Sequence, residues 1–327
     1  MKVIVTGIAG FIGFHTARAL LGAGHEVVGI DNLSTYYSVQ LKRDRLADLA
    51  RSGPFELNET DVSDMAAMRA LFSRHADATH VIHLAAQAGV RHSLERPDSY
   101  VSANVMGQTA VLEAVRKLER IEHVMYASSS SVYGANKEIP FSTAHRTTSP
   151  VSLYAATKLA AEHIAECYGH LYRIPATGFR FFTVYGPWGR PDMAAYKFAT
   201  QIVAGNPIPV FNHGDMSRDF TYIDDIVRGL LLALDKPPQP NTFGAPHQVY
   251  NLGNHRPTPL MHFIALLEQA LGREAVVRFE PMQQGDVKET FADIAQTQRD
   301  FGFDPQTTIE VGIPRFVEWF KAYHKVN

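Results

Sequence analysis

The segment KVIVTGIAGFIG, residues 2–13, decides how this chain begins to fold. Its first five residues form an apolar run that predicts a short buried strand. Gly7, Gly10 and Gly13 follow at once, and apolar residues then recur at helical spacing over residues 14–23. Glycines at such a turn accept torsions forbidden to other residues, and they let phosphate groups reach the amides at the N-terminus of the following helix. The segment therefore predicts a strand, a phosphate-binding turn and a helix.

Short apolar runs and segments with helical periodicity alternate through the rest of the first half. Strands separated by helices imply right-handed crossovers and a parallel sheet. We therefore expect an α/β fold, a Rossmann-type doubly wound parallel sheet with a smaller C-terminal substrate-binding lobe. The predicted strands are residues 26–30, 55–59, 80–84, 123–127 and 176–182, and the predicted helices are residues 102–118 and 154–171.

Asp31 ends the second predicted strand, 18 residues after Gly13. A carboxylate at this place binds the ribose hydroxyls of NAD, and it would repel the additional phosphate of NADP. NAD is therefore the expected cofactor. Asp61 follows the third strand and could meet the adenine, although an Asp there also commonly caps the next helix. The small residues Ala85 and Ala86 would let the backbone approach the nicotinamide half.

The composition of the chain changes past Gly186, where proline and glycine recur every few residues. We expect an NAD-binding domain over residues 1–185 and an interwoven substrate lobe over residues 186–327, with residues 220–253 returning to the first domain. Further helices are predicted at residues 224–234, started by an Asp cap, 260–271 and 309–323, and a surface loop at residues 236–246.

Tyr154 and Lys158 lie four residues apart, which places a phenol and an ammonium on one face of a helix. A tyrosine with the usual pKa of about 10 is a poor base at neutral pH, and a nearby lysine favours the phenolate. Tyr154 could then take a proton from a sugar hydroxyl, and Ser129, in the run of serines 128–131, would hold the same oxygen. Such a pair alone is often a solvated helix face; the glycine turn and the serine run make the catalytic interpretation the stronger one.

Composition narrows the class of protein. The formal net charge is −2 and no block of five basic residues occurs, which disfavours nucleic acid and anionic membrane as partners. The single cysteine, Cys167, is expected in the core; it forms no intrachain disulfide, which favours a reducing compartment. No signal peptide or membrane span is apparent, so we expect a cytoplasmic protein. No pair of the 15 histidines has metal-ligand spacing with a carboxylate, so no metal is expected.

The chain resembles the extended short-chain dehydrogenase/reductases over essentially its whole length, and among them the UDP-glucuronate 4-epimerases most closely. The first five blocks of the resemblance are shared widely in the extended family, and the last three are more selective. The blocks are TGIAGFIG (6–13), DNL (31–33), HLAAQAGVR (83–91), SSSSVYG (128–134), SLYAATK (152–158), FRFFTVYGPWGRPDM (179–193), VFNHGDMSRDFTYIDDI (210–226) and MQQGDV (282–287).

The resemblance implies a reaction that begins with oxidation at carbon 4 of a UDP-sugar. Relatives that eliminate water carry an acidic pair beside the catalytic serine, and relatives that form UDP-xylose carry a glutamate. Ser130 and Ser131 stand there in this chain. The expected outcome is return of the hydride to the other face of the keto-sugar after it rotates. This is epimerisation, with NAD regenerated in each cycle.

A hexuronate is the expected sugar. Thr183 stands where similar galactose epimerases have asparagine, and Arg190 and Arg91 could supply charge for a carboxylate. Thr183, with Ser128 or Ser129, is expected to hold that carboxylate so that carbon dioxide is not lost. Arg218 is assigned to the pyrophosphate and Asp286 to the uridine ribose; Gln283 replaces an arginine of the galactose epimerases.

The resemblance also supplies the complete set of expected contacts, with Tyr154, Lys158 and Ser129 as catalytic residues. The expected substrate contacts are Ser128, Ser129, Gly89, Arg91, Tyr154, Thr183, Arg190, Val210, Phe211, Arg218 and Asp286. The expected cofactor contacts are Gly7, Gly10, Phe11, Ile12, Gly13, Asp31, Asn32, Asp61, Val62, Leu84, Ala85, Ala86, Asn104, Tyr154 and Lys158.

Three alternatives remain at this point. The first is a UDP-glucose or UDP-N-acetylglucosamine 4-epimerase, the second a UDP-xylose-forming decarboxylase, and the third a dinucleotide-binding sensor without turnover. Helices near residues 102–118 and 154–171 resemble those through which the family forms homodimers, although their apolar faces could equally be covered within one chain.

Overall fold

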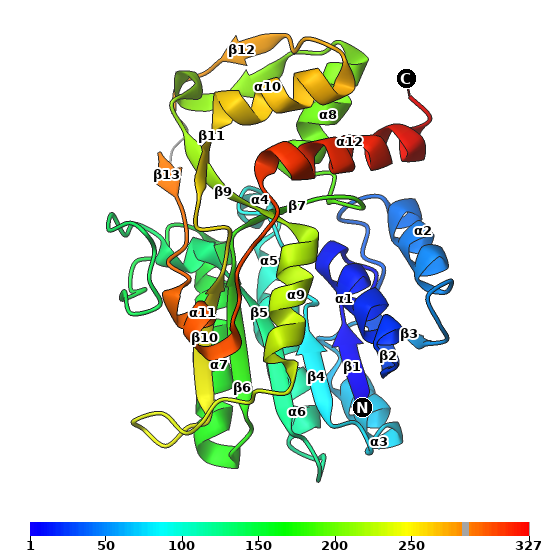
Figure 1. Cartoon of the computed structure of the whole chain (residues 1–327). Coiled ribbons are helices and arrows are strands. Elements are labelled where there is room, and N and C mark those ends of the chain that lie inside the picture. The colour runs from blue at the N-terminus through cyan, green and yellow to red at the C-terminus, as the bar shows by residue number, and fades with distance from the viewer. Residues whose placement is uncertain (283–287, 327) are drawn as a thin grey trace.

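The computed structural model describes residues 1–282 and 288–326 and contains a larger and a smaller lobe (Figure 1). The larger lobe is built on a seven-stranded sheet in the order β10-β6-β5-β4-β1-β2-β3, and every neighbouring pair is parallel. This is the predicted Rossmann-type fold. The strands are β1 (Lys2–Thr6), β2 (Glu26–Asp31), β3 (Glu56–Glu59), β4 (His80–His83), β5 (His123–Ser129), β6 (Ala176–Phe181) and β10 (His247–Leu252).

Helices cover both faces of this sheet, which explains why β1 and β2 are buried apolar runs without alternation. Successive side chains of a strand point to opposite faces. Val3 and Val5 of β1 pack in one core with α1 and α9, whereas Ile4 packs in a second core with α3, α6 and α7. The helices of this lobe are α1 (Phe11–Gly22), α2 (Val39–Leu49), α3 (Met65–Arg74), α4 (His92–Glu95), α5 (Pro97–Tyr100), α6 (Gly107–Val115), α7 (Leu153–Tyr172), α9 (Ile223–Leu234) and α11 (Ala295–Phe301), with short turns of other helix types at η1 (Val101–Met106) and η2 (Ser130–Tyr133).

The smaller lobe has its own sheet, centred on β9 (Ser217–Tyr222). β11 (Pro257–Pro259) pairs with β9 antiparallel, and β7 (Thr183–Tyr185) and β13 (Glu289–Thr290) pair with it parallel. Phe220 of β9 stacks on Phe263 of α10, with ring centroids 4.3 Å apart, in the core of this lobe. The remaining elements are β8 (Ile208–Val210), β12 (Val277–Phe279), α8 (Ala194–Ala204), α10 (Leu260–Leu271), α12 (Ile309–His324) and the turn η3 (Phe211–Gly214).

A buried carboxylate ties the two lobes together. Asp219 of β9 is fully buried, and one of its oxygens accepts a hydrogen bond from the backbone N–H of Asn254 (2.6 Å). The other accepts from the N–H groups of His255 and Ala292, each at 3.0 Å. Asn254 and His255 follow β10 of the large sheet, so Asp219 holds the chain where it leaves that sheet for the smaller lobe.

Three sequence expectations differ from the structure. Helix α1 begins at Phe11 rather than residue 14, because the glycine turn is shorter than its three glycines suggest. Helix α9 has no Asp cap: Tyr222 is its N-cap, and Asp224 lies inside the first turn. Cys167, expected in the core, is exposed, because α7 turns this position away from the sheet.

No helix in the described ranges is long and apolar enough to cross a membrane.

We expect Asp219→Ala to lower the free energy of unfolding by about 3–5 kcal/mol, because it leaves buried N–H groups without an acceptor. Guanidinium unfolding measures this loss. Asp215→Ala is the matched control, since the Asp215 side chain is 68% exposed and pairs with Lys288 at the surface; its change should stay within about 0.5 kcal/mol. Equal stabilities of the two variants would contradict this role of Asp219.

Candidate active site

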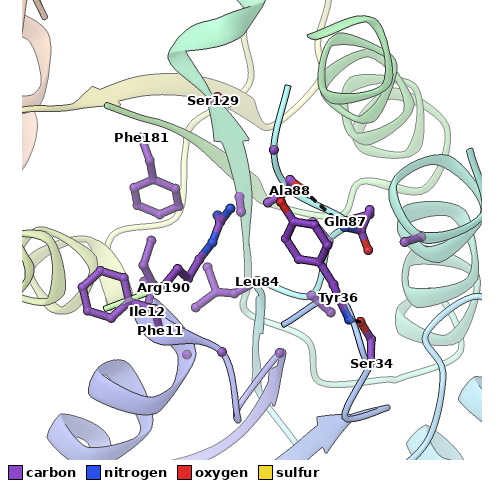
Figure 2. Close-up of a pocket in the computed structure, with 18 of the residues that line it drawn as sticks. Phe11, Ile12, Ser34, Tyr36, Leu84, Gln87, Ala88, Ser129, Phe181 and Arg190 are labelled. Atoms are coloured by element: carbon purple, nitrogen blue, oxygen red, sulfur yellow. Dashed lines mark hydrogen bonds between the residues drawn. The ribbon is translucent and has the colours of Figure 1, made fainter. Parts of the chain in front are cut away.

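A cavity of about 380 Å³ opens at the carboxyl ends of the parallel strands, beneath the smaller lobe (Figure 2). The chain leaves β1 towards β2 on one side, and β4 lies on the other side. Such a reversal in strand order is where open α/β sheets bind their ligands. Segments far apart in sequence line the cavity, from the glycine turn after β1 to Arg190 and Met193 after β7.

The glycine turn has no room for side chains. A Cβ on Gly7, whose φ is +72°, would lie 2.7 Å from the backbone nitrogen of Ala85, and a Cβ on Gly13 would lie 2.0 Å from the carbonyl oxygen of Gly7. Gly10 is the N-cap of α1 and supplies no side-chain cap to the first turn. The first-turn amides of a helix have no acceptor within the helix, so this cradle suits a phosphate. The residues present therefore fit a dinucleotide.

Asp31 lies at the far end of the cradle and is buried. Its oxygens accept hydrogen bonds from the N–H groups of Ala9 (3.0 Å) and Leu33 (2.9 Å). Burial raises the pKa of this carboxyl, and Lys42 opposes that shift. Lys42 also lines the cavity and donates to the carbonyl of Ser34 at 2.7 Å. Sequence reasoning missed Lys42, because it lies eleven residues beyond Asp31 on a separate helix.

The other expected cofactor positions separate into two groups. Asn104 does not line the cavity; it is buried, accepts from the N–H of Gln87 and donates to Thr157, and so supports the loop after β4. In the same loop, the Thr6 hydroxyl accepts from the N–H of Ala85 and contacts His83 at 2.7 Å. The cavity does contact Gly7, Gly10, Phe11, Ile12, Gly13, Asp31, Asn32, Asp61, Val62, Leu84, Ala85, Ala86, Tyr154 and Lys158.

The predicted catalytic group converges at one end of the cavity, where Tyr154, Lys158 and Ser129 all line it. Ser129 is the last residue of β5, and Ser152 caps α7 by accepting from the N–H of Ala155 at 3.1 Å. This cap places Tyr154 in the first turn of α7, one turn before Lys158. The Ser129 hydroxyl lies close enough to the Tyr154 phenol to lower its pKa. The hydroxyl pair and the ammonium therefore meet as the sequence predicted.

The sequence predicted that Lys158 favours the phenolate of Tyr154, whereas in the folded chain burial has the largest effect on the pKa of this phenol. Burial raises the pKa of Tyr154, and the neighbouring Ser129 hydroxyl partly offsets this. The charge of Arg190 also lowers the pKa of the phenol, and the charge of Asp192 raises it. Burial lowers the pKa of Lys158 to about 8. Within this chain alone the phenol is therefore protonated at neutral pH.

Ser128 has a different partner from its neighbour. Its hydroxyl donates to Glu162 of α7 at 2.5 Å, and Glu162 forms a doubly hydrogen-bonded ion pair with Arg180 at 2.7 and 2.9 Å. The Ser128 hydroxyl therefore already donates its proton to Glu162 and cannot donate it to a ligand at the same time. Glu162 is an acid near the serine run that sequence reasoning missed, but Arg180 neutralises it and it does not line the cavity.

The expected sugar contacts are only partly gathered. Gly89, Thr183 and Arg190 line the cavity. Figure 2 shows the Arg190 side chain beside Leu84, with Phe181 on one side of its guanidinium and Tyr36 on the other in this view. Arg91 lies outside the lining, 5.2 Å above the ring of Phe211. Val210, Phe211 and Arg218 are also outside the lining, and Asp286 and Gln283 lie outside the described residues.

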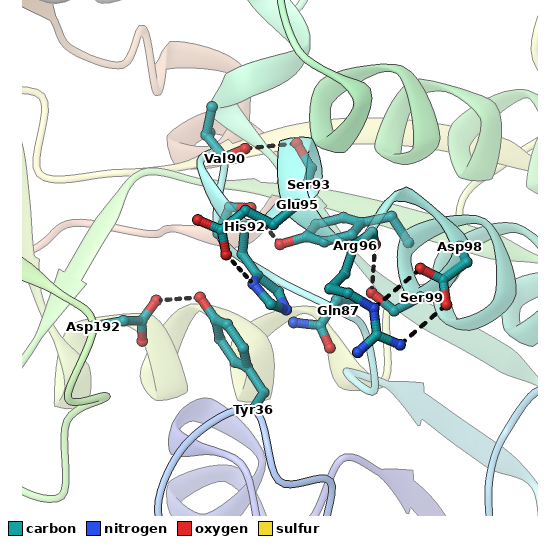
Figure 3. A network of polar contacts seen from close by, with 12 residues as sticks. Tyr36, Gln87, Val90, His92, Ser93, Glu95, Arg96, Asp98, Ser99 and Asp192 are labelled. Carbon is teal, nitrogen blue, oxygen red and sulfur yellow. Dashed lines mark hydrogen bonds and ion pairs between the residues drawn. The ribbon is translucent and has the colours of Figure 1, made fainter.

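Arg190 is held by an acid that the sequence analysis did not single out. Its Nε and Nη2 atoms donate to the two oxygens of Asp192 at 3.0 and 2.5 Å. The hydroxyl of Tyr36 donates to the same carboxylate at 3.0 Å (Figure 3). Burial acts to raise the pKa of Asp192, but Arg190 outweighs it and the pKa falls. Only the folded arrangement reveals Tyr36, because it lies 156 positions before Asp192.

Comparison with known proteins agrees with this geometry. Residues 3–253 match the NAD dependent epimerase/dehydratase family. This chain belongs to that family, and its cofactor is NAD. A probable UDP-glucuronate 4-epimerase of Rhizobium meliloti is 46% identical over 99% of this chain and 98% of its own length. The protein CapI of Staphylococcus aureus is 46% identical over 99% of this chain and all of its own.

A solved structure extends the comparison to three dimensions. The UDP-glucuronic acid 4-epimerase of Bacillus cereus, crystallised with UDP-glucuronic acid and NAD, superposes with a TM-score of 0.90 at 33% identity. The match covers 99% of this chain and 100% of that one.

Substitution of Gly13 by alanine tests the cradle. Because the new Cβ would meet the Gly7 carbonyl at 2.0 Å, we expect Gly13→Ala to weaken NAD binding at least about tenfold. Gly22→Ala, in the last turn of the same helix, meets nothing within 4 Å and should bind NAD normally. Calorimetric titration with NAD measures both affinities. Normal binding by Gly13→Ala would show that the turn is not the phosphate site.

The lowered pKa of Lys158 predicts a pH dependence of stability. Above pH 8 the folded chain has released this proton, whereas the unfolded chain holds it up to about pH 10.5. The unfolded state then binds more protons, so this lysine makes stability rise with pH. Relative to Lys158→Met, the cofactor-free wild type should gain about 1 kcal/mol per pH unit between pH 8 and 10. Urea unfolding at several pH values measures the difference, and parallel curves would contradict the shift.

Proposed function

We propose that this chain is a UDP-glucuronate 4-epimerase, which interconverts UDP-glucuronate and UDP-galacturonate. The observation that carries the proposal is the meeting of Tyr154 and Ser129 with Thr183 and Arg190 in the cavity that holds the glycine cradle. The first pair can move a proton at a sugar hydroxyl. The second pair can bind the carboxylate that distinguishes a hexuronate from a hexose. The names of the relatives in Rhizobium meliloti and Bacillus cereus agree with this choice.

Each catalytic side chain has a definite task in this proposal. Tyr154 takes the proton from the hydroxyl on carbon 4, and Ser129, which lies beside the phenol in the cavity, holds the same oxygen. Lys158 binds the nicotinamide ribose. NAD, when bound, accepts the hydride from carbon 4 and returns it, and its positive ring favours the phenolate that burial disfavours. Gly7, Gly10 and Gly13 hold its pyrophosphate, and Asp31 binds its adenosine ribose.

The sugar end decides which epimerase this is. A 4-keto hexuronate is a β-keto acid and loses carbon dioxide easily when the breaking bond aligns with the ketone. We assign Thr183 and Arg190 to the carboxylate, where they keep that bond poorly aligned. Asp192 occupies Nε and Nη2 of Arg190, so Nη1 is the nitrogen that Asp192 leaves for the sugar. Ser128 is the weaker carboxylate partner, because its proton goes to Glu162.

Two properties of the assembly belong to the same proposal. The chain is cytoplasmic, in keeping with its single cysteine. It forms a homodimer through η1 and α7, where Val101, Met106, Leu171 and Tyr172 are 44–60% exposed.

The proposed contacts of the UDP moiety and its sugar remain Arg91, Val210, Phe211, Arg218 and Asp286.

Incubation with sugar nucleotides tests the activity. Purified protein and NAD should convert UDP-glucuronate to UDP-galacturonate, and UDP-glucose and UDP-N-acetylglucosamine should react far more slowly. Chromatography with mass spectrometry separates the products. A product lighter by carbon dioxide would favour the decarboxylase, and turnover of UDP-glucose alone would favour the hexose epimerase.

Substitution of the phenol separates catalysis from binding. We expect Tyr154→Phe to lower kcat by about 10²–10⁴-fold while NAD still binds, because only the acid–base group is removed. An unchanged kcat would remove Tyr154 from the mechanism. Absence of turnover in both the wild type and the variant, with NAD bound, would favour a sensor.

The fate of the carboxylate tests Thr183. We expect Thr183→Ala to release some UDP-pentose by decarboxylation, because the carboxylate is then held less firmly. Thr200→Ala, a threonine of α8 whose hydroxyl donates to the Tyr196 carbonyl, is the control and should release none. Unchanged epimerisation by Thr183→Ala without pentose would refute the role of Thr183.

A further inference from the structure

The loop of residues 187–192, which carries Arg190, is held by side chains of the NAD-binding lobe at both ends. At its start, His15 of α1 donates through Nε2 to the carbonyl of Pro187 at 2.9 Å. Burial and the neighbouring Arg18 lower the pKa of His15 to about 3, so the ring is neutral at physiological pH. Its Nδ1 atom accepts from Arg18 at 3.1 Å, which fixes the tautomer that donates to Pro187.

Arg45 of α2 makes the central contacts with this loop. It is fully buried, and it donates to the Trp188 carbonyl from Nε at 3.2 Å and from Nη2 at 2.7 Å. Nη2 also donates to the Gly189 carbonyl at 3.2 Å. These contacts hold Trp188 at a φ of +62°, a backbone conformation that costs a non-glycine residue about 1 kcal/mol or more. Arg45 thus binds two successive carbonyls just before Arg190. These bonds fix the direction in which the chain reaches Arg190.

The same guanidinium contacts the glycine turn. Nη1 of Arg45 donates to the Ala9 carbonyl at 2.9 Å and to the Tyr37 hydroxyl at 2.7 Å. Ala9 lies between Gly7 and Gly10, and its N–H donates to Asp31. Ala9 of the phosphate cradle is thus held at its N–H by the acid assigned to the adenosine ribose, and at its carbonyl by the arginine that holds the Arg190 loop.

Tyr36 holds the other end of the loop. Its hydroxyl donates to Asp192 (Figure 3). Asp192 in turn holds Arg190 by two hydrogen bonds. The ring of Tyr36 packs against His92 with centroids 4.9 Å apart. A Cβ on Gly89 would meet the Tyr36 hydroxyl at 2.4 Å, so the phenol can occupy this position only because residue 89 has no side chain. The neighbouring tyrosines 36 and 37 therefore contact the Asp192 carboxylate and the Arg45 guanidinium respectively.

We propose that His15, Arg45 and Tyr36 are positioning residues that form a clamp on residues 187–192, set Arg190 for a carboxylated sugar nucleotide, and build the carboxylate site and the dinucleotide cradle as one unit. This proposal rests on the proposed function, because it assigns the substrate carboxylate to Arg190. It makes hexuronate specificity depend on residues of the cofactor lobe. A purely structural role for the clamp would instead weaken all sugar nucleotides equally.

Binding of two sugar nucleotides tests the clamp. The probes are UDP-glucuronate and UDP-glucose, which differ in the carboxylate, titrated calorimetrically into NAD-loaded protein. We expect Tyr36→Phe to weaken UDP-glucuronate binding about three- to tenfold, because it loses one charge-assisted hydrogen bond, and to change UDP-glucose binding less than about twofold. Arg45→Lys should weaken UDP-glucuronate at least about tenfold, because an ammonium cannot replace the planar fork. If Arg45→Lys does not fold, Tyr36→Phe carries the test alone.

A double substitution distinguishes positioning from direct contact. In an Arg190→Ala background, Tyr36→Phe should cause no further loss of UDP-glucuronate affinity, since the group that it positions is gone. The control is Tyr250→Phe, which also removes a phenol–carboxylate hydrogen bond (2.8 Å to Asp300) but lies on β10; both affinities should remain normal.

Two results would overturn the clamp: equal weakening of both nucleotides by Tyr36→Phe, or a full Tyr36→Phe effect in the Arg190→Ala background. Failure of the proposed function is separate, since it would appear in the wild type as absence of UDP-galacturonate.

Discussion

The parallel pairing of β1 with β4, and of β4 with β5, brings the carboxyl ends of three strands to one edge of the sheet. The glycine turn follows β1, Leu84 and the small residues Ala85 and Ala86 follow β4, and Ser129 ends β5. Each of these segments is short and leaves its main-chain groups accessible, so a dinucleotide and a sugar can both lie close to the main chain. The smaller lobe then covers this edge, and its β7 carries Thr183 into the cavity.

The fold and the cofactor end of the site could be predicted from local sequence. The 2–13 segment, Asp31 and the strand–helix alternation are short-range patterns, and each reports directly on backbone geometry. The Tyr154–Lys158 pair was likewise predictable, because both residues lie on one helix. Cys167 was misplaced because helical periodicity in α7 does not reveal which face the sheet covers.

The polar support of the site could not be predicted in the same way. Arg45, Asp192 and Glu162 act through contacts with residues 18 to 156 positions away along the chain. No local pattern distinguishes a buried arginine that holds carbonyls from a solvated arginine on a helix. Charge also behaved differently from the sequence argument, because burial governs the pKa of both Tyr154 and Lys158. The electrostatic balance therefore belongs to the folded site rather than to its sequence motif.

The central claim of the proposed function is that hydrogen leaves carbon 4 of the sugar and returns to the same carbon, with Tyr154 and Ser129 as the acting residues and with no removal of the proton from carbon 5. Isotopic labelling tests it most directly. UDP-glucuronate carrying deuterium at carbon 4 would be converted in ordinary water, and the UDP-galacturonate formed would be analysed by NMR and mass spectrometry. The account predicts complete retention of deuterium at carbon 4 and no solvent hydrogen at carbon 5. Loss of the label to water, or solvent exchange at carbon 5, would contradict it.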